Sequence, residues 1–176
     1  MFLELLRKRR SIRKFTHHPV EPGLIDQIIE AALRAPSSKG LYPWEFIVVT
    51  DRKLLEKLSQ TKPHGSSFLK EAPLCIVVCG RPDKSDMWVE DCAIASTLML
   101  LAAESLGLGA CWIQIRNRKH DDYKLASNYV SELLEIPGEM EVEAIIAAGY
   151  PDEQKPGHDP EKLKRDRVHQ NRFGQN

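Results

Sequence analysis

The feature that most limits how this chain can fold is a long apolar segment, residues 85–106, with the sequence SDMWVEDCAIASTLMLLAAESL. It is the longest segment with a helical pattern, and its middle is apolar almost all round. Such a helix must be enclosed, because no side of it suits contact with water. Gly107 and Gly109 are expected to end it. Ser96 and Thr97 interrupt the apolar run, so it is too short to predict a membrane span.

The other periodic segments predict a small sheet with helices between its strands. Strands are expected at residues 44–50, 72–80, 110–115 and 142–150, and further helices at 2–9, 22–35, 51–60 and 123–134. The first helix is expected to turn Phe2, Leu5 and Leu6 inward. Strands that alternate with helices favour a parallel α/β sheet when the pattern is taken alone.

Composition limits the possible classes of function. The chain has 176 residues, which suits a single domain, and its 25 basic residues balance its 25 acidic ones. No global charge therefore drives binding to nucleic acid or to a membrane surface. The four cysteines, Cys75, Cys79, Cys92 and Cys111, lie in or beside apolar segments and are expected to be reduced core thiols. With no signal peptide recognised, we expect a cytoplasmic protein.

Common catalytic and metal-binding patterns are missing from the sequence. There is no Gly-Lys-Ser/Thr triplet, no HExxH, no G-x-S-x-G, and no spacing of histidines and cysteines that suits a metal. The segment GLGACW has Trp112 where a dinucleotide-binding turn needs glycine. We therefore assign no catalytic side chain and expect no metal. If the protein is an enzyme, a cofactor should carry the chemistry.

A basic run near the start of the chain is the clearest candidate for a binding site. Six of the eight residues from Arg7 to Lys14 are lysine or arginine. Guanidinium groups with a serine hydroxyl suit a phosphate monoester. The same run could instead be a solvated basic face at the end of the first helix, where cations are favoured. Charge alone leaves both interpretations open.

Five segments in order along the chain resemble one known family. They are RRSIRKF, APSSKGLYPWEFIVV, DCAIASTLMLLAAESLGLGACWI, AAGYPDEQKP and VHQNRFG. Together they resemble the nitroreductase family of FMN-dependent oxidoreductases, over nearly the whole chain. The resemblance implies a single α+β domain over 1–176, in which a mixed, mainly antiparallel sheet is flanked by helices, with an extended basic tail at 155–176. We prefer this fold to the parallel sheet. The resemblance also implies a homodimer with FMN at the interface, whose partner subunit would enclose the apolar helix.

The resemblance also implies roles for individual residues. Four would contact the phosphate and ribityl chain, namely Arg9, Arg10, Ser11 and Arg13. A loop would reach the flavin ring from the partner subunit, namely Pro36, Ser37, Ser38, Lys39 and Gly40. Ile113 and Gln114 would lie against the isoalloxazine edge, and Lys164 and Arg165 would form a second phosphate clamp.

Two positions depart from the family pattern. Many members have Glu-Gly or Gly-Gly where this chain has Gln114-Ile115. Many also place an asparagine, which binds the pyrimidine ring, where this chain has residues 64–67, HGSS.

The function implied is transfer of hydride from NADH or NADPH, through tightly bound FMN, to a small acceptor such as a nitroaromatic, a quinone or an enone. One alternative is a specialised flavin enzyme, such as a dehalogenase or a flavin-fragmenting enzyme. Another is a basic module that binds nucleic acid or another anion. We expect no nucleic acid, membrane or metal partner.

Overall fold

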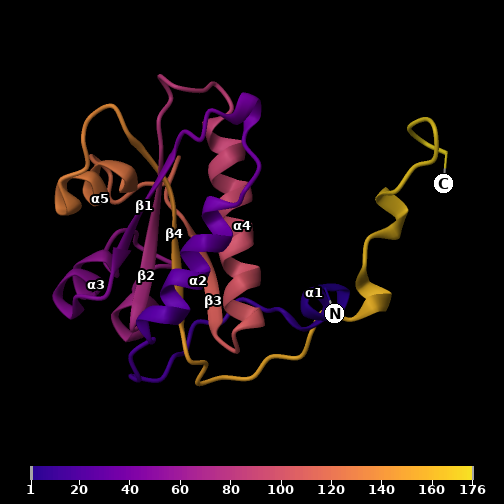
Figure 1. The fold of residues 1–176 in the computed structure, drawn as a ribbon, viewed down its shortest axis with the longest axis horizontal. Coiled ribbons are helices and arrows are strands. Elements are labelled where there is room, and N and C mark those ends of the chain that lie inside the picture. The colour runs from indigo at the N-terminus through magenta and orange to yellow at the C-terminus, as the bar shows by residue number, and fades with distance from the viewer. Residues whose placement is uncertain (1, 176) are drawn as a thin grey trace.

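A computed structural model describes residues 2–175 of the chain. It contains one four-stranded sheet with helices on both faces (Figure 1). The helices are α1 (Phe2–Lys8), α2 (Pro22–Leu33), α3 (Arg52–Leu58), α4 (Trp88–Ser105) and α5 (Ala126–Leu134). The strands are β1 (Trp44–Val49), β2 (Leu74–Gly80), β3 (Gly109–Gln114) and β4 (Glu141–Gly149). Short 3-10 turns are η1 (Ser38–Gly40), η2 (Ser67–Glu71), η3 (Pro160–Lys162) and η4 (Arg165–Arg167). Each predicted helix and strand is therefore present, with boundaries that differ by a few residues.

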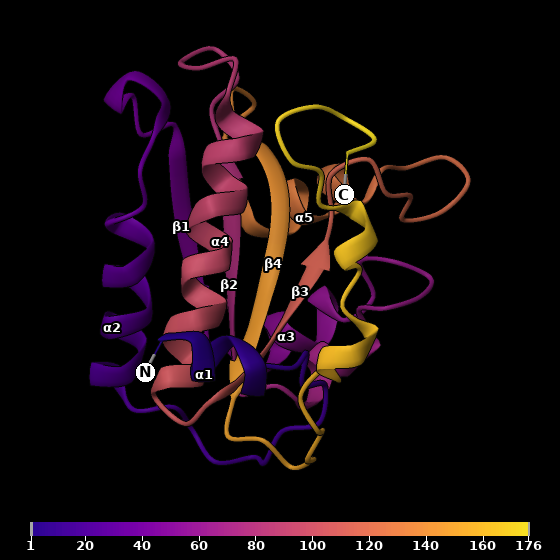
Figure 2. The ribbon, with the colours of Figure 1, turned by 90° about the vertical axis from the view of Figure 1, so that its right-hand side faces the viewer.

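The sheet has the order β1-β2-β4-β3, and all neighbouring strands are antiparallel (Figure 2). The α+β prediction is confirmed, and the parallel sheet favoured by the alternating pattern is wrong. The chain crosses from β2 to β3 through α4, and these two strands run in the same direction, as the alternating pattern suggests. They are not neighbours, however, because β4, which comes later in the sequence, lies between them and is antiparallel to both.

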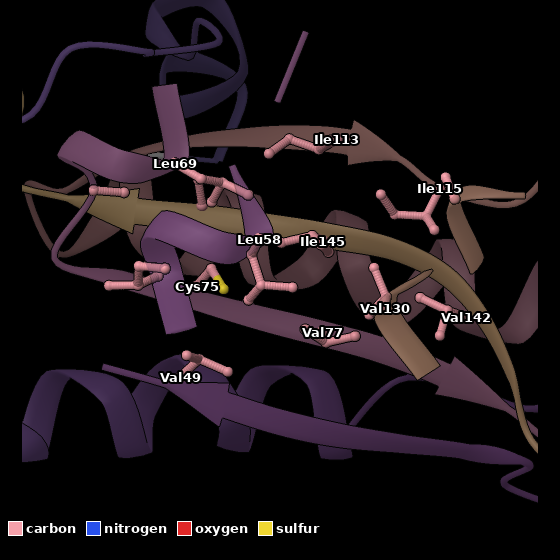
Figure 3. Close-up of a cluster of buried hydrophobic side chains, with 14 of the residues drawn as sticks. Val49, Leu58, Leu69, Cys75, Val77, Ile113, Ile115, Val130, Val142 and Ile145 are labelled. Atoms are coloured by element: carbon pink, nitrogen blue, oxygen red, sulfur yellow. The ribbon is translucent and has the colours of Figure 1, made fainter. Parts of the chain in front are cut away.

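Two apolar layers enclose the sheet. One lies between the sheet and α3, α5 and η2; it includes Val49, Leu58, Leu69, Val77, Val130 and Ile145 (Figure 3). The other lies between the sheet and α2 and α4; it includes Ile28, Ile76, Met99 and Ile146. Because both layers are apolar, β2 and β4 are buried on both faces, which explains their continuous apolar sequences.

Helix α4 is enclosed on only one side within this chain. Its buried residues form a single stripe, namely Trp88, Asp91, Cys92, Ala95, Ser96, Met99 and Ala103. On the other side, Ile94 is 40% exposed. The expectation for α1 is wrong, since none of its residues is buried and Phe2 is 63% exposed. The chain therefore presents apolar surface on both helices.

The expectations for the cysteines and for membrane-spanning helices can be compared with the structure of residues 2–175. All four cysteines are buried and free. None of the helices in this range is both long and apolar enough to cross a bilayer. The cytoplasmic location stays a prediction.

The segment after α1 packs tightly against the start of β3. The Ile12 amide donates to the Ala110 carbonyl at 3.1 Å, and the Ile12 side chain is buried. A Cβ atom on Gly109 would lie 2.8 Å from the Cβ of Ile12. Glycine at 109 therefore allows the N-terminal segment to lie directly on the strand.

Replacing Gly109 with alanine should force this contact apart. We expect Gly109→Ala to lower the free energy of unfolding by about 1–3 kcal/mol, the usual cost of overpacking. Urea denaturation measures the change. Gly138→Ala is the matched control, because nothing lies within 4 Å of a Cβ atom there. Equal effects of the two substitutions would contradict the proposed packing constraint.

Candidate functional site

The basic run is fixed between β3 and the chain that follows β4. Ser11 forms a parallel bridge with Ala110 at the start of β3, and Phe15 forms an antiparallel bridge with Pro151 just after β4. The Asp152 amide donates to the Lys14 carbonyl at 2.9 Å. The basic run is therefore part of the folded framework of the protein, in contrast to a mobile basic arm.

The basic side chains surround a small cavity of about 250 Å³. Its lining residues are Arg9, Arg10, Ser11, Arg13, Lys155 and His158. The Lys155 ammonium donates to the Ser11 carbonyl at 2.9 Å, and the Arg10 guanidinium donates to the Pro156 carbonyl. The structure thus brings together the four residues expected at the phosphate and adds Lys155 and His158. This clustering of cations suits a phosphate.

Lys155 and His158 were missed because nothing periodic marks the segment that carries them. The Phe15–Pro151 bridge places this segment beside the basic run. A Cβ atom on Gly157 would collide with the Arg7 carbonyl oxygen, so glycine lets the chain pass close over the end of α1. One feature of the sequence could have identified Lys155, namely that it lies only a short distance after the G-Y-P segment.

Glu153 organises the cations of the cavity. One of its carboxylate oxygens accepts the Arg13 amide at 2.6 Å, the Lys14 amide at 3.2 Å and the Lys155 ammonium at 2.8 Å. The bond from Lys155, assisted by the two amides, lowers the pKa of Glu153. Glu153 therefore fixes both Lys155 and the turn that presents Arg13.

Lys164 and Arg165 lie farther along the tail, on an exposed segment at η4. The tail leaves the body of the molecule near α1 and projects away from the sheet (Figure 1). The structure therefore does not bring these two side chains into the cavity, and their role at the phosphate stays a prediction.

The Pro36–Gly40 loop is held at the start of α4 by a buried acid. The Ser37 hydroxyl donates to Asp91 at 2.7 Å, and the Ser38 amide donates to the same carboxylate at 3.1 Å. Lys39 adopts a left-handed conformation with φ of 53°, so its peptide geometry depends on this anchor. Asp91 was not identified from the sequence, since it lies within the apolar helix.

The loop and the basic cavity lie at opposite ends of α4. Arg10 shares a second hollow with Glu104 and Gly107 at the end of the helix, whereas Asp91 is in its first turn. Eighteen helical residues span about 27 Å. Within one chain, the loop and the cavity are therefore too far apart to contact the same part of a bound ligand.

Strand β3 provides an open edge that begins at the cavity. The bond from Ile12 to the Ala110 carbonyl shows that Ala110 directs its main-chain groups away from β4. By the alternation of a strand, Gln114 does the same. The two residues are separated by about 13 Å along an extended strand. Ile113 is buried and directs its side chain into the core.

The Gln114 side chain is fully engaged with protein groups on the other side of the strand end. Its carbonyl accepts the Trp112 indole N–H at 2.9 Å, and its amide donates to Glu143 at 3.1 Å. Glu143 lies at a bulge in β4, where the register with β2 shifts. It is 4% exposed, and one of its oxygens has no hydrogen-bond partner among the described residues. A glutamine at 114 is thus explained, because a glutamate there would face a buried carboxylate.

The loop that replaces the family asparagine approaches this strand end from the open side. The Lys62 ammonium donates to the Gln114 carbonyl at 2.8 Å. In the segment 64–67, Ser66 is buried and donates to the Ser59 carbonyl at 2.9 Å, so its hydroxyl supports the loop. The side chain that reaches β3 is therefore that of Lys62, just before the positions expected from the sequence.

The arrangement suits an elongated, anionic ligand. A cluster of cations lies at one end of the open strand edge, and main-chain groups of Gln114 lie at the other. A flavin mononucleotide has a phosphate, a flexible linker and a ring with hydrogen-bonding edges, which matches this order of groups. No group of three or more potential metal ligands is found in residues 2–175.

The lowered pKa of Glu153 predicts a pH-dependent contribution to stability. The contribution is present above the ordinary glutamate pKa of about 4.3 and is lost as the pH falls through the lower value in the folded protein. Glu153→Gln should therefore be less stable than the parent at pH 7, and the difference should shrink below about pH 4.3. Thermal unfolding across pH 3–7 tests this. For Glu56→Gln, at an exposed site on α3, we expect little difference at any pH.

The pairing of Gln114 with Glu143 predicts a reciprocal effect of substitution. Gln114→Glu removes the amide donor and places a second carboxylate beside Glu143, so we expect a loss of about 1–3 kcal/mol in unfolding free energy. Adding Glu143→Gln should restore most of it, because the amide and carboxylate then exchange places. Urea denaturation of the two single variants and the double variant forms the cycle. Gln60→Glu, at an exposed position, is the control, and a double variant no more stable than Gln114→Glu would refute the pairing.

Comparison with known proteins agrees with this geometry. The family model described as "Nitroreductase family" matches residues 6–150. The solved structure of an FMN-dependent nitroreductase from Clostridium difficile R20291 is 48% identical, with a TM-score of 0.96, and covers 97% of this chain and 99% of that one. A relative from Archaeoglobus fulgidus, named provisionally as an NADH dehydrogenase/NAD(P)H nitroreductase, is 35% identical over 97% of this chain and 98% of its own length.

A more distant relative carries a different activity in its name. The iodotyrosine deiodinase of Thermotoga neapolitana is 28% identical over 89% of this chain and 91% of its own length. The family model nevertheless covers most of this chain, including the basic run, the open edge of β3 and the whole sheet. On this match, the chain belongs to the nitroreductase family.

Proposed function

We propose that this protein is an FMN-dependent oxidoreductase that takes hydride from NADH or NADPH and reduces a small acceptor, such as a nitroaromatic, a quinone or an enone. The observation that carries the proposal is the cation-lined cavity at one end of the open β3 edge. The relative from Clostridium difficile is named as FMN-dependent, and the one from Archaeoglobus fulgidus is named for NAD(P)H, which supports both parts of the proposal.

The side chains of this chain would bind and orient the cofactor. Arg9, Arg10, Arg13 and Lys155 would hold the phosphate, with Glu153 keeping Lys155 in position. The main chain of Gln114 would align the ring edge, and the side chain of Gln114 keeps this strand end fixed. When bound, FMN supplies the hydride-transfer chemistry, and the protein supplies orientation and charge.

The absorption spectrum of the purified protein tests the proposal directly. We expect a flavin band, either as isolated or after reconstitution with FMN, that bleaches on anaerobic addition of NADH or NADPH. A protein that shows no flavin band after reconstitution would refute the proposed function.

The site would be completed by a second copy of the chain. The Pro36–Gly40 loop, which Asp91 holds, leads into β1 at the edge of the sheet opposite to β3, so the loop of a partner would be needed at the ring. Exposed apolar side chains on α1 and on the outer side of α4 offer surface for such contact. In this arrangement, Lys164 and Arg165 of the tail would serve as a second phosphate clamp. Light scattering of the protein with FMN should give the mass of a dimer.

A dehalogenase is the second candidate function, because one relative is named as an iodotyrosine deiodinase. An anaerobic screen of the reduced enzyme separates the two candidates. Faster oxidation by nitroaromatics, quinones or enones supports the first function, and faster oxidation by a halogenated phenol with halide release supports the second. A nucleic-acid module is disfavoured by the neutral net charge and by the clustering of the cations around one small cavity.

Arg10→Ala should weaken FMN binding by about 1.5–3 kcal/mol, because it removes a charge-assisted contact to the phosphate. Quenching of FMN fluorescence on titration measures the affinity. Lys14→Ala is the matched control, since Lys14 belongs to the same basic run but does not line the cavity. Equal affinities of Arg10→Ala and the parent would instead support a solvated basic face.

A further inference from the structure

We propose that the hollow at the end of α4 is a subsite for an adenylate group, whose phosphate lies against Arg10 and Lys155 and whose ribose hydroxyls donate to Glu104. The hollow has a volume of about 680 Å³, which is in the range of small-ligand sites. FMN, which ends at its phosphate, would not reach into it. The inference rests on the proposed function for the source of the adenylate, which is NADH, or FAD bound in place of FMN, but binding to the hollow can be tested without a flavin.

The first argument is that the hollow adjoins the phosphate cavity. Arg10 and Lys155 line both spaces, so a phosphate bound to them faces both. The Arg10 guanidinium is held by the Pro156 carbonyl, to which it donates. The Lys155 ammonium is held by the Ser11 carbonyl at 2.9 Å and by Glu153 at 2.8 Å. Two linked phosphates carry about the same charge as one phosphate monoester, so these fixed cations suit a dinucleotide as well.

The second argument is the character of the wall that α4 provides. Glu104, in the last turn of the helix, lines the hollow and is half-buried. Among the described residues, no group donates a hydrogen bond to its carboxylate or forms an ion pair with it. The C-terminal end of a helix also carries partial negative charge. This wall therefore suits groups that donate hydrogen bonds, such as ribose hydroxyls, and the remaining charged group of the lining is Lys8 at the end of α1.

The third argument is that the rest of the lining leaves room for a flat base. Ile12 and Leu108 contribute apolar surface and are themselves fixed in the core. Gly107 turns the chain at the edge of the hollow with φ of 77°, and a Cβ atom on it would meet nothing within 4 Å beyond its neighbours in the chain. A base can therefore lie against this wall with no side chain in its way.

The position of Glu104 also selects between nucleotides. In dinucleotide-binding proteins of another fold, a carboxylate that bonds the ribose 2′-hydroxyl recognises an unphosphorylated ribose. A phosphate on that hydroxyl would lie beside the charge of Glu104 and be repelled. The hollow therefore favours the adenylate of NADH or FAD over that of NADPH.

Binding of AMP to the purified protein tests the subsite. We expect AMP to bind more tightly than inorganic phosphate, and Glu104→Gln to weaken AMP binding about tenfold, as for loss of a hydrogen bond to a charged group. The direction is diagnostic, because removal of a negative charge would otherwise strengthen the binding of an anion. In the parent protein, 2′,3′-dideoxy-AMP, which lacks the hydroxyls, should bind about as weakly as AMP binds to Glu104→Gln. Equilibrium dialysis measures each affinity.

A matched variant and the dideoxy ligand control the result. Glu90→Gln removes the same charge from an exposed site in the first turn of α4, and it should bind AMP as the parent does. If Glu104→Gln fails to fold, the comparison of AMP with its dideoxy analogue in the parent decides the question. Parental or tighter AMP binding by folded Glu104→Gln, or equal binding of the two nucleotides by the parent, would overturn the inference.

Two measurements on Glu104→Gln identify the source of the adenylate. A weaker affinity for FAD with an unchanged affinity for FMN, measured by flavin fluorescence, assigns the subsite to FAD. A higher KM for NADH with an unchanged kcat, in the FMN-loaded enzyme, assigns it to NADH. Failure of the parent protein to bind any flavin would overturn the proposed function, while the AMP affinities would still decide on the hollow.

Discussion

The contact between Ile12 and the start of β3 is the constraint on which the site depends. The Ile12 amide bonds to Ala110, its side chain is buried, and Gly109 leaves the room for it. Because Ile12 is fixed in this way, Arg10 and Arg13 are held at the open end of the sheet. The same residues would form only a charged surface if the segment were free. An apolar side chain inside a basic run thus converts local charge into a defined cavity.

The strands and helices could be predicted from the sequence because their apolar patterns are strong. The order of the strands could not, since pattern alone does not show that β4 enters between β2 and β3. The resemblance to the family supplied the antiparallel sheet. The exposure of α1 and of Ile94 could not be predicted from the sequence pattern either. The pattern shows that a side chain is apolar, but it does not show which surface, if any, covers that side chain. A dimer would resolve this difference.

The site could be predicted to the extent that its residues are close in sequence. Arg9, Arg10, Ser11 and Arg13 lie in one run and line one cavity. Lys155 joins them through a strand bridge near Pro151, and Asp91 holds its loop from within an apolar helix. Glu143 reaches Gln114 because a bulge shifts the register of β4. Such contacts between distant parts of the chain follow from tertiary structure, and no local sequence pattern predicts them.

The two departures from the family pattern have a common physical consequence at the end of β3. Glu143 holds the side chain of Gln114 from one side of the strand, and Lys62 holds its carbonyl from the other. A negative and a positive group therefore lie on opposite sides of one peptide segment, and each is bonded to it. Charged groups fixed before a ligand arrives need no reorganisation when charge develops in the ligand. The departures in Gln114 and in the loop before η2 are thus best understood together, as two halves of one electrostatic arrangement on a rigid strand end.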